Sequence, residues 1–211
     1  MSLCELAKKS ALIVVDVQND FCPGGSLAIE GGDKVVDVIN RVAPFFGYVV
    51  ATKDWHPAGH VSFASSHPGK KPFDTAISGG VSQTLWPDHC VRGTPGAQLH
   101  PRLDTKAFAA VIHKGRRPLM DSYSAFFEND GKTSTGLEFL LRGLGYSTVF
   151  VCGLATDVCV KFSGQDALRL RFATYLIEDA SRGVAEKSTI EALQSLKSSG
   201  ANIISSGEIT A

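Results

Sequence analysis

The stretch that decides the fold covers residues 148–160 and reads Thr148-Val149-Phe150-Val151-Cys152-Gly153-Leu154-Ala155-Thr156-Asp157-Val158-Cys159-Val160. Its first five residues form an almost continuously apolar run, which is typical of a strand buried on both faces of a sheet. A helical pattern continues from this stretch to Arg171, and a second apolar run, Thr174–Ile177, follows it. Strand, helix and strand in this order predict a βαβ unit in a parallel sheet.

The same alternation runs through the rest of the chain. The predicted strands are Ala11–Val17, Tyr48–Thr52, Ala109–His113, Thr148–Cys152, Thr174–Ile177 and Asn202–Ser205. The predicted helices are Lys34–Phe45, Thr135–Arg142, Asp157–Arg171 and Glu186–Ser199. We therefore predict an α/β fold with a central six-stranded, mainly parallel sheet and helices on both faces. No boundary divides the sequence, so we expect a single domain over residues 1–211.

One long segment interrupts the alternation. Residues 55–102 have no clear periodicity and are rich in Gly, Pro, Ser and His. A loop of this length inside a compact domain is usually functional, so we predict a functional loop at about 55–102.

Composition narrows the class of protein. The chain is 44% hydrophobic and 20% charged, and 21 Lys and Arg balance 21 Asp and Glu. Without a basic stripe or a long apolar run, we expect no nucleic-acid partner and no membrane partner. The five cysteines are irregularly spaced and no secretory signal is recognisable, so we expect reduced thiols and a cytoplasmic location. Homo-oligomer formation is left open.

Reactive side chains stand at the ends of four predicted strands: Asp16, Asp54 with His56, Lys114, and Cys159. The carboxyl ends of parallel strands meet at one edge of a sheet, where the sites of such folds form. We therefore expect these side chains to lie together.

Cys159 has the position of a nucleophile. It stands in the first turn of a predicted helix, which Thr156 or Asp157 could cap. The helix dipole at this point, and a cation such as Lys114, would lower the pKa of the thiol. A lone cysteine is more often a buried structural residue, and we interpret Cys152, inside a strand, in that way.

A nucleophilic site also needs a base and an oxyanion hole, and the sequence offers candidates for both. Asp16 could take the thiol proton and return it to a leaving amine. Backbone N–H groups between Leu154 and Cys159 could hold a developing oxyanion.

The same edge offers a metal site. Asp54 and His56 point to the same side of an extended segment, and His89 in the long loop could close over them. One carboxylate and two imidazoles suit Zn²⁺, Fe²⁺ or Mn²⁺, with open positions for water or substrate. His60 is a further candidate ligand. The alternative is that these side chains lie on a hydrated loop without a metal.

Five motifs, taken together, resemble the isochorismatase-like cysteine hydrolases, and among them most closely the nicotinamidase/pyrazinamidase family. They are Asp16-Val17-Gln18-Asn19-Asp20-Phe21, Asp54-Trp55-His56-Pro57, Trp86-Pro87-Asp88-His89-Cys90-Val91, His113-Lys114-Gly115 and Gly153-Leu154-Ala155-Thr156-Asp157-Val158-Cys159-Val160. The resemblance implies a three-layer α/β/α fold and an Asp-Lys-Cys triad at Asp16, Lys114 and Cys159. It also implies an oxyanion hole at Ala155 and Cys159, with a cis peptide bond between Leu154 and Ala155.

The resemblance further implies a substrate and a metal. The metal ligands would be Asp54, His56 and His89, with His60 an added ligand in some members, and we expect one divalent ion, Zn²⁺ before Fe²⁺ or Mn²⁺. The substrate would be nicotinamide, and pyrazinamide as well, hydrolysed through a thioester on the cysteine. The metal would hold the pyridine nitrogen, and the ring would contact Phe21, Trp86 and Tyr123.

Three other interpretations compete with this one. Isochorismatases do not use the cysteine nucleophile, so Cys159 argues against an isochorismatase. Carbamoyl amidases lack the metal residues, so Asp54 argues against a carbamoyl amidase. A catalytically silent binding protein of the same family would be expected to have lost a residue of the triad. A redox protein using Cys90 and Cys159 finds no support in their spacing.

Overall fold

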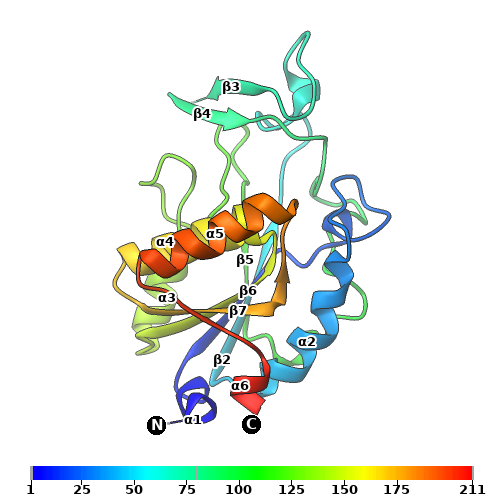
Figure 1. The fold of residues 1–211 in the computed structure, drawn as a ribbon. Coiled ribbons are helices and arrows are strands. Elements are labelled where there is room, and N and C mark those ends of the chain that lie inside the picture. The colour runs from blue at the N-terminus through cyan, green and yellow to red at the C-terminus, as the bar shows by residue number, and fades with distance from the viewer. Residues whose placement is uncertain (1, 79, 211) are drawn as a thin grey trace.

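The computed structural model describes residues 2–78 and 80–210, and its centre is a six-stranded sheet (Figure 1). The strand order is β5-β2-β1-β6-β7-β8, and every pair of neighbours is parallel. The strands are β1 (Ala11–Val15), β2 (Tyr48–Asp54), β5 (Ala110–Lys114), β6 (Thr148–Leu154), β7 (Ala173–Arg182) and β8 (Asn202–Ile204). The predicted six-stranded parallel sheet is confirmed.

Helices cover both faces of this sheet, as the sequence predicts. They are α2 (Val35–Val42), α3 (Leu137–Gly143), α4 (Lys161–Arg169) and α5 (Glu186–Ser198). Two further short helices, α1 (Leu3–Ala7) and α6 (Gly207–Thr210), lie beside the two termini (Figure 1). Alternate residues of β1 separate the two layers of core. Leu12 and Val14 pack in the cluster that contains the apolar face of α2, whereas Ile13 packs in the cluster of α3, α4 and α5. The result is a three-layer α/β/α arrangement.

Most predicted limits shift by a few residues, and two elements depart further from their prediction. The predicted helix 157–171 is divided into a π-helical turn, Thr156–Val160, and α4. Strand β7 continues to Arg182, well beyond the predicted end at Ile177, because Ser181 and Arg182 pair with Gly153 and Leu154 of β6 after an irregular register. Apolar periodicity could not predict this extension, since its residues are largely polar.

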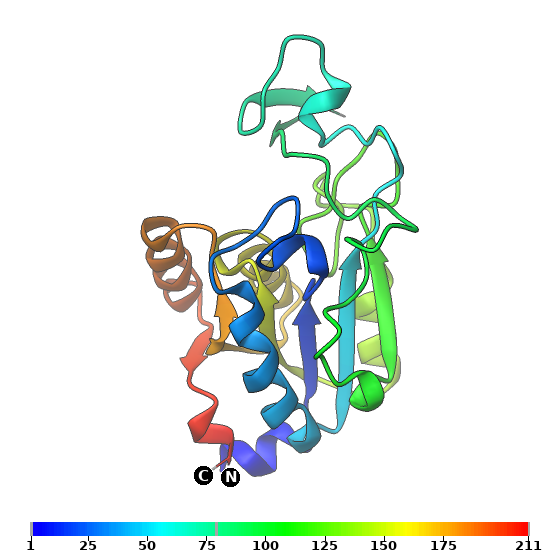
Figure 2. The ribbon, with the colours of Figure 1, turned by 90° about the vertical axis from the view of Figure 1, so that its right-hand side faces the viewer.

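The segment 55–102 is not structureless throughout. It contains an antiparallel hairpin of β3 (Thr75–Ser78) and β4 (Val81–Thr84). This hairpin stands beyond the carboxyl edge of the sheet, at the end of the molecule opposite the termini (Figures 1 and 2). None of the helices among the described residues is both long and apolar enough to span a bilayer.

Candidate active site

Strand register brings the polar side chains of the strand ends together. β2 and β5 pair so that Asp54 lies opposite Lys114. In the neighbouring pair, Val15 of β1 lies opposite Gly153 of β6, and Asp16 follows directly. Asp16 has a φ of 49°, in the left-handed region that few residues other than glycine adopt. This turn changes the direction of the chain at the edge of the sheet where β2 ends at Asp54 and β5 ends at Lys114.

Lys114 is the centre of the resulting cluster. Its Nζ lies 2.8 Å from Oδ2 of Asp16 and 3.5 Å from Sγ of Cys159, and it also donates to the carboxylate of Asp54. A further hydrogen bond, of 2.8 Å, goes to the carbonyl oxygen of Ser122. Burial alone would lower the pKa of this lysine, but the two carboxylates raise it well above its ordinary value. Lys114 is therefore a fixed cation beside the thiol.

The second member of the cluster, Asp16, is fully buried. Its Oδ1 accepts a 2.6 Å hydrogen bond from the hydroxyl of Thr52. Its Oδ2 faces Lys114 but accepts no hydrogen bond of good geometry. Burial raises the pKa of Asp16 to about 6, and the ammonium of Lys114 opposes that rise. Above that pH the carboxylate is ionised and can accept a proton.

Cys159 lies on the π-helical turn, buried to 6% exposure. The expected capping by Thr156 or Asp157 is wrong. Ala155 occupies the cap position without a side-chain hydrogen bond. The carboxylate of Asp157 instead accepts hydrogen bonds from the backbone N–H groups of Val184 and Ala185, at the start of α5.

The expectation of a lowered thiol pKa is also wrong for this structure. Burial raises the pKa of Cys159 well above its ordinary value, and Lys114 opposes the rise without overcoming it. The physical reason is that a thiolate loses its hydration in this pocket, and the carboxylates of Asp16 and Asp54 also disfavour a second negative charge. The thiol is therefore neutral at rest and needs a base to become a nucleophile.

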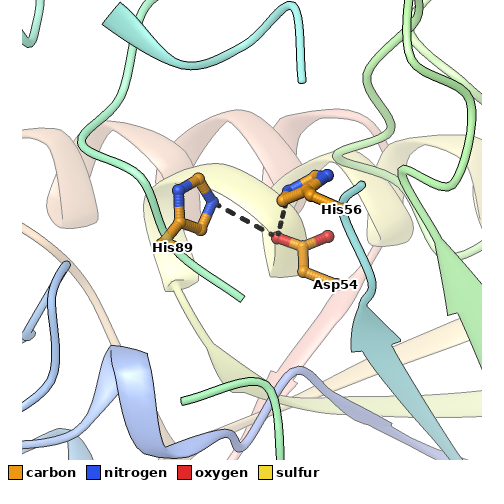
Figure 3. Close-up of side chains that lie close together, drawn as sticks. All are labelled: Asp54, His56 and His89. Atoms are coloured by element: carbon orange, nitrogen blue, oxygen red, sulfur yellow. Dashed lines mark ion pairs between the residues drawn. The ribbon is translucent and has the colours of Figure 1, made fainter. Parts of the chain in front are cut away.

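A second cluster adjoins the first through Asp54, which pairs with Lys114. Figure 3 shows its three side chains, Asp54, His56 and His89. Oδ2 of Asp54 lies 3.6 Å from Nε2 of His56 and 3.8 Å from Nε2 of His89. One ligand atom from each of the three residues falls within 4.8 Å of the others, and all three are buried. The structure thus brings together the three predicted metal ligands.

The hydrogen bonds of the two histidines fit a metal site. Nδ1 of His56 donates to the carbonyl oxygen of Gly115 at 2.9 Å, and Nδ1 of His89 donates to that of Pro87 at 2.7 Å. A carbonyl can only accept, so each Nδ1 carries a proton, which leaves each Nε2 facing the carboxylate of Asp54 as the atom available to a metal. Gly115 is required here, because a Cβ at this position would lie 2.4 Å from Cε1 of His56. The donor set suits a divalent transition metal.

A small pocket connects the two clusters. Its lining includes Cys159 and the neighbouring Ala155 on one side, and Asp54 and His89 on the other. The three predicted aromatic residues, Phe21, Trp86 and Tyr123, also line it, together with Leu27, Ile29, Asp121, Val158 and Val184. Nε1 of Trp86 donates to the hydroxyl of Tyr123 at 3.2 Å, which holds both rings in place. The pocket has the flat apolar walls that an aromatic ring needs.

Comparison with known proteins identifies the family. Residues 10–208 match the isochorismatase domain. The chain belongs to the isochorismatase family.

Similar members of the isochorismatase family carry more specific names. The chain is 52% identical to the nicotinamidase of Escherichia coli over 82% of its own length and 83% of that protein. The structure of PnC1 from L. infantum in complex with nicotinate is 41% identical, with a TM-score of 0.84, over 96% of this chain and 95% of that one. The pyrazinamidase of Pyrococcus horikoshii in complex with zinc is 36% identical, with a TM-score of 0.78, over 93% of this chain and 99% of that one.

Two other expectations drawn from the isochorismatase family concern single positions. The peptide bond between Leu154 and Ala155 is cis, as expected. His60 stacks on His56 with ring centroids 4.3 Å apart, but its Nδ1 contacts the hydroxyl of Ser62 and its Nε2 contacts the carbonyl oxygen of Met120. The structure therefore does not bring His60 into the group formed by Asp54, His56 and His89.

The sequence assigns no role to several residues of this isochorismatase-family site. Gln18 is fully buried, and its side-chain amide exchanges 2.8 Å hydrogen bonds with both the N–H and the carbonyl of Asp54. Thr52 holds Asp16, and Asp121 adds an unassigned carboxylate to the pocket. A buried amide directly after an apolar strand, as in Val17-Gln18, could have suggested such a role for Gln18.

Proposed function

We propose that this chain is a nicotinamidase, an amidohydrolase that converts nicotinamide and water to nicotinate and ammonia. The observation that carries the proposal is one pocket with Cys159 at one side, Asp54 and His89 at the other, and aromatic walls between them. Relatives over most of the chain bear the same name, at up to 52% identity. The same pocket would accept pyrazinamide, which differs from nicotinamide only in the ring.

In the first half of the proposed reaction, Cys159 is the nucleophile and Asp16 the proton carrier. Oδ2 of Asp16 takes the thiol proton while Sγ attacks the amide carbon, and the ammonium of Lys114 stabilises the negative charge on sulfur. The resulting oxyanion would lie at the backbone N–H groups of Ala155 and Cys159. Asp16 then gives its proton to the amide nitrogen, the C–N bond breaks, and ammonia leaves a thioester on Cys159.

Water completes the cycle. A water molecule loses a proton to Asp16 and adds to the thioester carbonyl. The C–S bond breaks and nicotinic acid leaves. The thiolate then recovers the proton from Asp16. The raised pKa of Asp16, about 6, suits this double use, because a proton carrier works best when its pKa is near the working pH.

The proposed metal would be held by Asp54, His56 and His89, and we propose Zn²⁺ ahead of Fe²⁺ or Mn²⁺. The two Nε2 atoms that face Asp54 and the zinc in the 36% identical pyrazinamidase support this choice. When bound, the metal would supply a directional position for the pyridine nitrogen of the substrate. The proposed domain, residues 1–211, includes 55–102 as its functional loop, because His56, Trp86 and His89 all come from that segment.

The test is ammonia release from nicotinamide by the full chain. We expect turnover by the wild type and none by Cys159→Ala. Cys152→Ala is the matched control, because Cys152 is buried in β6 and does not line the pocket. Appreciable activity in Cys159→Ala would contradict the thioester mechanism. A wild type that is inactive with its metal present would contradict the proposed substrate.

A further inference from the structure

Thr52 in β2 contacts the side chain and the backbone of Asp16. Its Oγ1 donates to Oδ1 of Asp16 at 2.6 Å and accepts from the Asp16 backbone N–H at 3.2 Å. Both residues have no exposed surface. The hydroxyl is thus held in one orientation, since its only proton is donated to the carboxylate and one of its lone pairs accepts from the amide.

This geometry makes the two oxygens of the carboxylate unequal. A separation of 2.6 Å is typical of a hydroxyl donating to a charged carboxylate, so Oδ1 is committed as an acceptor. Oδ2 is buried, accepts no hydrogen bond of good geometry, and lies 2.8 Å from Nζ of Lys114, which in turn contacts Sγ of Cys159. A proton that reaches Asp16 therefore has one free position, Oδ2, on the side of Lys114, whose ammonium contacts Sγ of Cys159.

We propose that Thr52 is a positioning residue for proton transfer, which keeps Oδ1 occupied so that the proton of Cys159 goes to Oδ2 and returns from there. The inference rests on the proposed function, because it concerns the same reaction. Loss of the hydroxyl would leave both oxygens of Asp16 open to the proton, although only Oδ2 lies beside Lys114. It would also free the carboxylate to rotate away from its place beside Lys114.

The effect should fall on kcat and leave KM unchanged, because Thr52 contacts Asp16 and does not line the substrate pocket. General acid–base transfer contributes about 10²- to 10⁴-fold, so losing its alignment should cost at least about 10-fold in kcat. A purely structural role would instead lower thermal stability and the amount of active enzyme without this kinetic pattern.

The experiment compares Thr52→Val, Thr52→Ser and Thr52→Ala with Thr174→Val. Thr174 is a matched control, because it is a buried threonine of β7 whose hydroxyl donates only to the carbonyl of Phe172. We expect kcat for nicotinamide to fall in the valine and alanine variants, to recover in the serine variant, and to be unchanged in Thr174→Val. If Thr52→Val does not fold, serine and alanine still form a pair that differs by the hydroxyl oxygen alone.

A second arm places Thr52→Val in an Asp16→Asn background. A residue that acts through Asp16 should cost nothing further there, because residues acting as one unit are not additive. Equal kcat in Thr52→Ser and Thr52→Ala, or a full additional loss in the Asp16→Asn background, would overturn the inference. Failure of the proposed function would look different, since the wild type itself would then release no ammonia from nicotinamide.

Discussion

Asp54 and Lys114 are register partners on neighbouring parallel strands, and the ammonium of Lys114 donates to the carboxylate of Asp54. The same ammonium contacts Asp16 and Cys159, and the same carboxylate faces the Nε2 atoms of His56 and His89. One buried ion pair thus joins the thiol cluster to the metal-ligand cluster. A substitution in one cluster should therefore alter the electrostatics of the other, because both clusters share the charges of Asp54 and Lys114.

Asp16 and Lys114 should behave as one unit. Asp16→Asn and Lys114→Ala should each lower kcat by about 10²- to 10⁴-fold, because the thiol is neutral at rest and loses either its base or its cation. The double variant should be little worse than either single one, as steady-state kinetics of all three would show. Asp20→Asn is the control, because the Asp20 carboxylate binds the backbone N–H of Cys90 instead. Fully additive losses would mean that the two residues act independently.

Activity should depend on the ionisation of Asp16. Below its pKa of about 6 the carboxyl is protonated and cannot take the thiol proton, so kcat/KM should fall as pH decreases through that value. A pH profile at two concentrations of added metal separates this limb from metal loss, because only metal loss responds to the added ion. A flat profile down to pH 5, or the same limb in the residual activity of Asp16→Asn, would rule out this assignment.

The ring nitrogen of the substrate should decide turnover. Nicotinamide and pyrazinamide each carry a nitrogen meta to the carboxamide, whereas benzamide has none to offer a metal held by Asp54, His56 and His89. We expect benzamide to be a very poor substrate, and chelation to suppress turnover of nicotinamide with part of the loss in KM. Comparable kcat/KM values for benzamide and nicotinamide would contradict this positioning role and would mean that Asp54, His56 and His89 are structural residues.

Metal content should depend on His89 and not on His60. His89→Ala removes an Nε2 that faces Asp54, so bound metal per chain, measured by elemental analysis, should fall severely. His60→Ala should retain the metal, because both ring nitrogens of His60 are already engaged by Ser62 and Met120. Loss of the metal from His60→Ala would show that His60 turns toward the site when the ion binds.

Local sequence patterns are enough to predict the architecture and most of the site. Strands buried on both faces are apolar along their whole length, so their number and approximate limits follow from the sequence without knowledge of their partners. The parallel arrangement then places the residues after each strand at one edge. Asp16, Asp54, Lys114 and Cys159 can therefore be grouped from their positions along the chain alone.

Only the tertiary structure decided properties that depend on burial and on distant partners. The pKa of Cys159 is raised instead of lowered, because the packed pocket removes water from the thiol and sets carboxylates beside it. Asp157 binds the backbone at the start of α5, and Thr52 binds Asp16, across separations that no local pattern reports. The polar end of β7 is a strand only because β6 offers it hydrogen bonds. Sequence determines which groups are present at the sheet edge, while packing determines their hydration, their protonation and the atoms they face.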